Sequence, residues 1–131
     1  MFRVLVVDDH AGFRGSVCSV LRSNFPQIRV AEAADGSEAL QSIQRHAMAM
    51  VLLDIRLPGA NGIELTKAIK TEHAPIVVVI LTGHDLPQYR QAAFRNGADC
   101  FLYKGSTSCM HDVLARVEGA ILAREGERRR G

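Results

Sequence analysis

The sequence predicts a doubly wound α/β fold, and three observations support this prediction. Short apolar runs recur along the chain, each ending at polar or turn residues. These runs lack the polar alternation of half-exposed strands, which is typical of strands buried on both faces of a parallel sheet. Between them lie segments with apolar residues at helical spacing. Five strands alternating with five helices predict a parallel sheet covered on both faces, with right-handed crossovers.

Length and composition indicate one soluble domain. The chain has 131 residues and 47% hydrophobic residues, and a domain of this size buries about two-thirds of its unfolded surface. We place the domain at residues 1–124 and interpret 125–131 as a basic tail or the start of an interdomain linker. The net charge of +2 is too small to indicate nucleic-acid binding by bulk electrostatics.

The expected location is the cytoplasm. No apolar run approaches the roughly 18 residues of a membrane helix, and no secretory signal opens the chain. The three cysteines are odd in number and none forms a CxxC pair. This pattern argues against a disulfide framework and against a structural zinc site, and it favours buried thiols.

The first half of the chain contains three strands and two helices. The strand at 4–7 is followed by a helix that ends before Pro26. Residues 28–33 form a shorter strand, and Asp35 then introduces a helix whose apolar face spans 39–47. The wholly apolar run 50–53 is the third strand, and Asp54 stands where that strand leaves the core.

The second half contains two strands and three helices. A loop through Pro58, Gly59 and Gly62 leads to a helix ending before Pro75. The most β-branched run, 76–81, is expected at the sheet centre. The remaining elements are a helix at 86–95 with a left-handed cap at Asn96-Gly97, a strand at 100–103, and a helix whose apolar stripe spans 110–121.

The predicted strands end in polar residues that share one edge of the sheet. Ligands of doubly wound sheets bind outside the carboxyl ends of the strands where the winding reverses. In the flavodoxin-like order 2-1-3-4-5 that point lies between strands one and three. The expected crevice therefore holds three carboxylates, with a hydroxyl and an ammonium from neighbouring strands: Asp8, Asp9, Asp54, Thr82 and Lys104.

This constellation indicates phosphoryl-transfer chemistry. Crowded carboxylates repel unless a cation lies among them, and oxygen ligands favour Mg²⁺. A carboxylate beside Mg²⁺ and an ammonium can act as the nucleophile toward a phosphoryl group, because both cations neutralise the phosphate oxygens. The product would be an aspartyl phosphate.

Four segments together resemble the receiver domain of two-component response regulators, the CheY-like family. The resemblance covers nearly the whole chain, and the first two segments are most similar to the NarL/FixJ subfamily, whose members usually carry a C-terminal LuxR-type helix-turn-helix. The segments are Val7-Asp8-Asp9-His10, Leu53-Asp54-Ile55-Arg56-Leu57-Pro58-Gly59, Leu81-Thr82-Gly83 and Tyr103-Lys104.

The resemblance implies a role for each site residue. Asp54 would be the phosphoacceptor, Asp9 would bind Mg²⁺ directly, and Asp8 would bind it chiefly through water. The backbone carbonyl of Arg56 would be a further metal ligand. The Lys104 ammonium would pair with the phosphate, and the Thr82 hydroxyl would donate a hydrogen bond to it. Phe101 would be the switch aromatic, which turns inward as Thr82 moves.

The implied function is a switch that catalyses its own phosphorylation and autodephosphorylation. The expected partner is a sensor histidine kinase, with a homodimer as a further option. DNA would be bound only by an effector domain outside these residues, which the receiver would control to regulate transcription. One alternative is a stand-alone CheY-like receiver acting through protein contacts.

Two other readings carry less weight. A haloacid dehalogenase-type phosphatase also uses a strand-end aspartate with Mg²⁺, but it needs a second acid two residues later, where this chain has Arg56. A degenerate receiver that only binds partners would not need intact Asp9, Asp54 and Lys104.

Overall fold

The computed structural model describes residues 1–130 and contains a five-stranded parallel sheet. The strand order is β2-β1-β3-β6-β7. Because β6 and β7 are the fourth and fifth strands of this sheet along the chain, the predicted order 2-1-3-4-5 is confirmed. The strands are β1 (Arg3–Val7), β2 (Arg29–Ala33), β3 (Met50–Leu53), β6 (Val77–Thr82) and β7 (Cys100–Tyr103).

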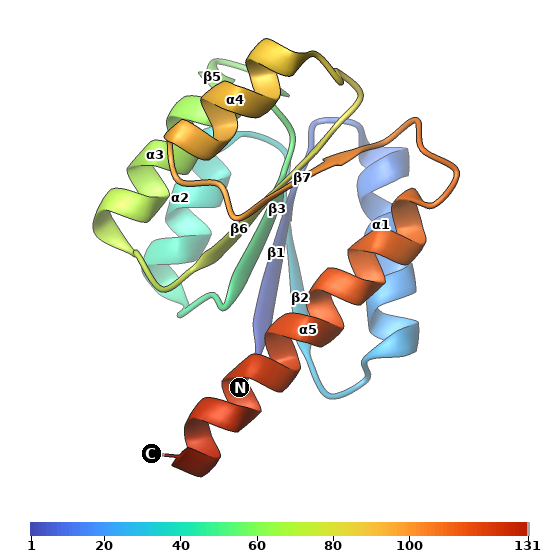
Figure 1. Ribbon diagram of the computed structural model, residues 1–131, viewed down its shortest axis with the longest axis vertical. Helices are drawn as coiled ribbons and strands as arrows, with labels where there is room; N and C mark the ends of the chain where they lie inside the picture. Colours follow the sequence, from blue (N-terminus) through green and yellow to red (C-terminus); the bar gives the residue numbers. More distant parts are fainter. Residues whose placement is uncertain (131) are drawn as a thin grey trace.

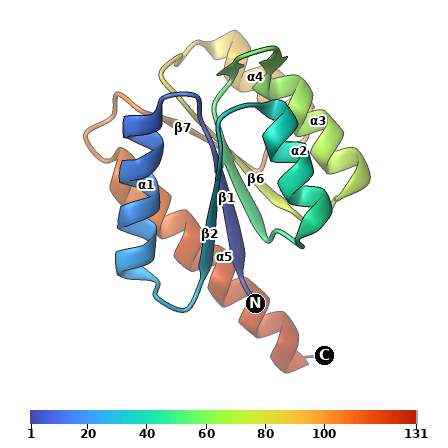
Figure 2. The ribbon, with the colours of Figure 1, turned by 180° about the vertical axis from the view of Figure 1, so that it is seen from behind.

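Helices cover both faces of the sheet, as the doubly wound prediction requires. In Figure 1 and, from behind, in Figure 2, the first and last helices share one face, and the three others share the opposite face. The three interior strands β1, β3 and β6 are almost wholly buried, which explains their continuous apolar runs, whereas the edge strand β2 is more exposed and carries Arg29 and Glu32. The helices are α1 (Ala11–Asn24), α2 (Gly36–Arg45), α3 (Gly62–Glu72), α4 (Pro87–Arg95) and α5 (Cys109–Arg130).

The core consists of two hydrophobic clusters, one on each face of the sheet. Successive strand residues point to opposite faces, so in β1 Leu5 belongs to the cluster beneath α2, α3 and α4, while Val6 belongs to the cluster beneath α1 and α5. The second cluster also contains all three cysteines, which are buried free thiols as expected: Cys18, Cys100 and Cys109.

Local signals set several helix ends. The side chains of His10, Asp35 and Asn61 cap α1, α2 and α3 by accepting a hydrogen bond from a backbone amide of the first turn. Gly97 follows α4 with φ of +102°, which confirms the left-handed turn predicted after that helix.

Two details differ from the sequence-based expectation. The central strand is β3, whereas β6, expected at the centre, is an interior strand paired with β3 and β7. The segment expected as a plain loop after Asp54 contains a small antiparallel hairpin of β4 (Arg56–Leu57) and β5 (Ala60–Asn61). Gly59, with φ of +67°, supplies the left-handed residue that lets the hairpin turn.

Helix α5 continues beyond the end of the sheet that carries the N-terminus (Figure 1). Its helical conformation extends to Arg130, so most of the segment interpreted as a tail or linker is helical. Glutamate and arginine are good helix formers, and this segment contains no proline. The domain boundary at residue 124 stays a prediction. Among residues 1–130, no helix combines the length and apolar character needed to span a membrane.

Candidate functional site

The polar residues at the carboxyl edge are held by the backbone of buried strands. Hydrogen bonds continue the strand pairing by one residue: the Asp54 amide donates to the Val7 carbonyl at 3.2 Å, and the Lys104 amide donates to the Thr82 carbonyl at 2.8 Å. Each side chain therefore starts from a rigid position, and its direction follows from the strand that carries it.

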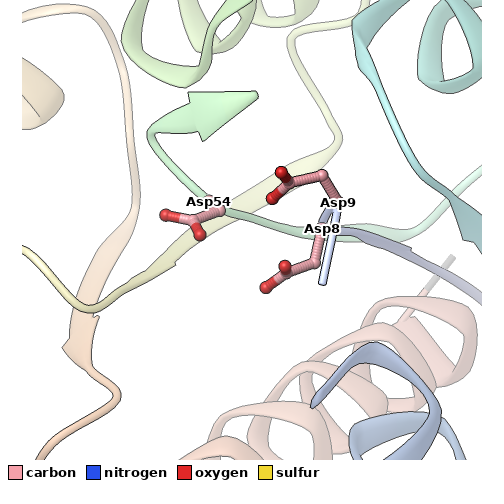
Figure 3. A group of neighbouring side chains, drawn as sticks. All are labelled: Asp8, Asp9 and Asp54. Atoms are coloured by element: carbon pink, nitrogen blue, oxygen red, sulfur yellow. The ribbon is translucent and has the colours of Figure 1, made fainter. Parts of the chain in front are cut away.

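Three carboxylates converge between β1 and β3 (Figure 3). One oxygen from each of Asp8, Asp9 and Asp54 can be chosen so that all three lie within 4.8 Å of one another. Asp8 and Asp54 are buried, with 3% and 8% of their surface exposed, and Asp9 is exposed. Clustered carboxylate oxygens open to solvent on one side are a donor set suited to a hard divalent cation that retains water ligands.

Lys104 partly neutralises this cluster. Its Nζ donates to Asp8 Oδ2 at 2.6 Å and to Asp54 Oδ2 at 2.9 Å. Burial of the ammonium lowers the pKa of Lys104, but its hydrogen bonds to the two carboxylates and their charges outweigh that effect, so the net pKa lies above the ordinary value of 10.5. Lys104 is therefore an ammonium at neutral pH.

The other oxygens of the two buried carboxylates accept backbone amides. Asp8 Oδ1 accepts from the amide of His10 at 2.8 Å, and Asp54 Oδ1 accepts from the amide of Ile55 at 2.7 Å. Each buried carboxylate is thus fixed at both oxygens, one by the ammonium and one by the chain that follows it. These hydrogen bonds orient both carboxylates toward the crevice.

Thr82 and Phe101, the two residues expected to form a switch, lie on β6 and β7. Thr82 is fully buried, and its Oγ1 accepts the amide of His84 at 3.2 Å. The Phe101 ring is only 4% exposed, and the guanidinium of Arg90 lies over it, 4.6 Å from the ring centroid. In this structure the aromatic side chain therefore points inward.

Arg56 occupies β4, and its side chain is exposed. It faces Asn61 in the hairpin that follows Asp54. The expected contribution of Arg56 is its backbone carbonyl, and that role stays a prediction.

Sequence reasoning missed four residues that contact this region. Arg14 and Arg90 reach the Asp8 carbonyl and the Phe101 ring, and Phe13 lies against the Lys104 ammonium. A Cβ on Gly62 would overlap the carbonyl oxygen of Asp54, so only glycine fits there. The glycine-rich loop hinted at a close approach, whereas nothing in the sequence paired the other three residues with their partners.

Comparison with known proteins points to one family. A model of the response regulator receiver domain matches residues 4–115. Among curated proteins, the probable transcriptional regulatory protein NarL of Mycobacterium tuberculosis is 38% identical over 105 residues, covering 80% of this chain and 49% of that protein. The nitrate/nitrite response regulator protein NarP of Escherichia coli is 32% identical over 80% of this chain and 49% of its own length.

Solved structures agree with these sequence matches. The signal receiver domain of the putative response regulator NarL from Mycobacterium tuberculosis superposes with a TM-score of 0.79 at 36% identity, covering 91% of this chain and 95% of that one. A CheY-like receiver domain protein from Methanospirillum hungatei gives a TM-score of 0.85 at 25% identity, covering 97% and 98%. The chain spans about half the length of the two curated relatives named above.

Proposed function

The chain belongs to the response regulator receiver domain family, and from this membership we propose that it accepts a phosphoryl group on Asp54 and responds with a changed surface. The observation that carries the proposal is the Lys104 ammonium bound to Asp8 and Asp54 beside a third carboxylate. That arrangement combines a nucleophile, a phosphate-binding cation and a donor set for a second cation.

The proposed chemistry is the transfer of a phosphoryl group to and from one carboxylate. An Asp54 oxygen bonds to phosphorus as the bond from phosphorus to the donor breaks, and hydrolysis later returns the carboxylate and releases inorganic phosphate. Lys104 stays protonated and pairs with the phosphoryl oxygens. Mg²⁺, held by Asp9 and Asp54, by Asp8 through water and by the Arg56 carbonyl, would supply further charge neutralisation when bound.

The proposed response involves Thr82 and Phe101. The Thr82 hydroxyl would donate to the phosphoryl group. Its oxygen accepts the amide of His84, and its proton remains available for this second hydrogen bond. Phe101, which lies opposite Ile80 on the neighbouring strand β7, would be held inward. The populations of two conformations of the surface formed by α4, β7 and α5 would then shift, while the fold stays the same.

In a longer protein this response would regulate transcription. The relatives are named as transcriptional regulators and as a nitrate/nitrite response regulator, and the chain covers about half of each. We propose a sensor histidine kinase as phosphodonor, and DNA contact through an effector domain rather than through these residues.

The deciding experiment is phosphorylation by phosphoramidate with and without Mg²⁺, followed by intact-protein mass spectrometry. We expect a Mg²⁺-dependent gain of one phosphoryl group in the wild type and none in Asp54→Asn. The matched control is Asp112→Asn, which removes a carboxylate on α5 that accepts from Ser108 and leaves the crevice intact.

Two results would contradict the proposal. One is a wild type that gains no phosphoryl group with this donor or with acetyl phosphate. The other is a gain that persists in Asp54→Asn, which would locate the acceptor elsewhere.

A further inference from the structure

Lys104 has a third neighbour besides its two carboxylates. Its Nζ lies 4.4 Å from the centroid of the Phe13 ring, which places the ammonium over an aromatic face. A lysine ammonium within about 6 Å of a ring centroid is attracted by the ring quadrupole, most strongly where water is excluded. The Lys104 side chain is only 19% exposed, so this contact lies in a partly desolvated site.

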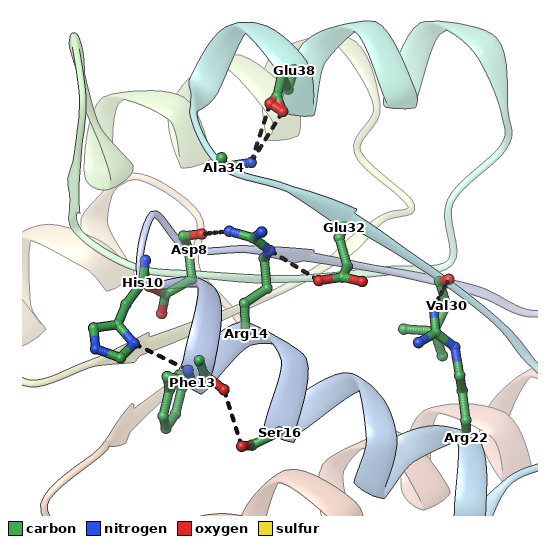
Figure 4. Close-up of polar contacts among 11 residues, drawn as sticks. Asp8, His10, Phe13, Arg14, Ser16, Arg22, Val30, Glu32, Ala34 and Glu38 are labelled. Atoms are coloured by element: carbon green, nitrogen blue, oxygen red, sulfur yellow. Dashed lines mark hydrogen bonds and ion pairs between the residues drawn. The ribbon is translucent and has the colours of Figure 1, made fainter.

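Phe13 is itself held firmly, because it belongs to the first turn of α1. Its amide donates to His10 Nδ1 at 3.0 Å, which caps the helix (Figure 4). The ring also packs half-buried against the hydrophobic cluster beneath α1 and α5. The ring that faces the ammonium is therefore fixed by both the backbone and the core.

The next residue ties the same turn to the carboxylate side of the site. Arg14 donates from one guanidinium nitrogen to the backbone carbonyl of Asp8 at 2.6 Å and from Nε to Glu32 at 3.0 Å (Figure 4). Two adjacent residues near the start of α1 thus contact the site: Arg14 bonds to the backbone of Asp8, and the Phe13 ring lies against the Lys104 ammonium.

We propose that Phe13 is a positioning residue for phosphoryl transfer, and that its ring keeps the Lys104 ammonium over the crevice. A lysine side chain is a point charge on a flexible four-carbon stem, so the position of its ammonium depends on every group that contacts it. When a phosphoryl group arrives, Lys104 must exchange carboxylate oxygens for phosphoryl oxygens. The aromatic face does not change in that exchange, because it is neither charged nor modified.

The inference rests on the proposed phosphoacceptor function, and two measurements separate the failure of one from the failure of the other. The first is the initial rate of Mg²⁺-dependent phosphorylation by phosphoramidate. In Phe13→Leu, which keeps an apolar side chain but removes the ring, we expect the rate to fall about three- to tenfold. In Phe13→Tyr, which keeps the ring, we expect the wild-type rate to return.

The second measurement is the NMR shift of the Lys104 ε-methylene protons, which needs no phosphorylation. Protons above an aromatic face are shielded by the ring current, so we expect an upfield shift in the wild type and in Phe13→Tyr. The shift should vanish in Phe13→Leu.

Phe25→Leu is the packing control. Phe25 is buried in the same cluster at the other end of α1, so the same substitution there removes a ring without touching Lys104. We expect lower stability and an unchanged phosphorylation rate. Equal slowing in Phe25→Leu and Phe13→Leu would overturn the inference in favour of simple packing.

Each remaining outcome also decides the inference. A phosphorylated wild type with an equally fast Phe13→Leu would overturn the positioning role and leave the proposed function standing. A wild type that accepts no phosphoryl group would reject the proposed function and, with it, a role in phosphoryl transfer, and the NMR shift would then report only whether the ring holds the ammonium.

Discussion

The crevice and the region beyond β6 are built from contacts of different strength. In the crevice, Lys104 meets Asp8 and Asp54 at 2.6 and 2.9 Å, with the carboxylate side chains only 4% and 11% exposed. Beyond β6, Arg90 meets Asp85 at 3.2 Å, with both side chains more than 40% exposed. The first pair of contacts is buried and short, and the second is open to solvent.

This difference separates what must stay fixed from what can shift. Exposed ion pairs are worth about 0–1 kcal/mol, whereas removing one partner of a buried pair costs about 3–5 kcal/mol. Phosphoryl transfer needs fixed geometry, and a switch needs two states close in free energy. The strong contacts hold Asp54, whereas Arg90, which covers the Phe101 ring, is held by a weak one.

The largest expected effect comes from Gly62→Ala. The added methyl would overlap the carbonyl oxygen of Asp54, which belongs to the rigid backbone of the crevice. We expect a loss of about 3 kcal/mol in the free energy of unfolding, measured by urea denaturation. A fully stable variant would show that the crevice backbone yields more easily than its contacts indicate.

Gly15→Ala is the matched control for that substitution. A Cβ there meets no atom within 4 Å, and alanine is favoured over glycine inside a helix such as α1. This variant should gain about 0.5–1 kcal/mol.

Charge removal should have opposite signs in the two regions. Without Mg²⁺, Asp9→Asn relieves repulsion among the three carboxylates and should stabilise the protein by about 1 kcal/mol. Asp85→Asn breaks an exposed ion pair and should destabilise it by about 0.2–1 kcal/mol. Thermal unfolding with and without Mg²⁺ checks both, and the Asp9→Asn gain should shrink when the metal is added. If both substitutions changed the free energy of unfolding in the same direction, the proposed difference between the two regions would be wrong.

The contact between Arg90 and Phe101 should also be weak. A double-mutant cycle of Arg90→Ala and Phe101→Leu, followed by urea unfolding, should give a coupling of about 0.5–1 kcal/mol. Arg95→Ala, at the exposed end of the same helix, is the control and should show no coupling with Phe101→Leu. A coupling above 2 kcal/mol would place this contact among the strong ones.

The last prediction concerns pH and has no effect at neutral pH. Burial, followed by the nearby Glu32 charge, raises the pKa of Cys18 from 9.0 to about 11. Between pH 9 and pH 11 the unfolded chain therefore binds fewer protons at this thiol than the folded chain, so the free energy of unfolding falls as pH rises. Urea unfolding at pH 7, 9 and 10 should show a smaller decline above pH 9 in Cys18→Ala than in the wild type.

The stabilising contribution of Lys104 begins to fall at a higher pH than that of the Cys18 thiol, because its unfolded pKa is 10.5 rather than 9.0. Its folded pKa lies above the unfolded value of 10.5, so its stabilising contribution is complete below pH 10.5 and is lost only as pH rises through the folded pKa. A decline above pH 9 that is unchanged in Cys18→Ala would contradict the assignment of the first loss to that thiol.

Residues adjacent in sequence determined most of the fold. The apolar runs predicted the five parallel strands, and the residues at their ends predicted that Asp8, Asp9, Asp54 and Lys104 would meet. These predictions succeeded because strand burial and strand direction follow from a local pattern, an apolar run with polar residues at its end. The hairpin after Asp54 was missed because strands of two residues are too short to show a pattern of burial in the sequence.

Only the tertiary structure decided which side chains touch across the fold. Nothing local links Phe13 to Lys104, Arg90 to Phe101, or Gly62 to the carbonyl of Asp54. Each of these contacts depends on how a helix or loop packs against the sheet, at distances set by the whole core. The sequence by itself determined which groups reach the crevice, and packing decided how firmly each one is held.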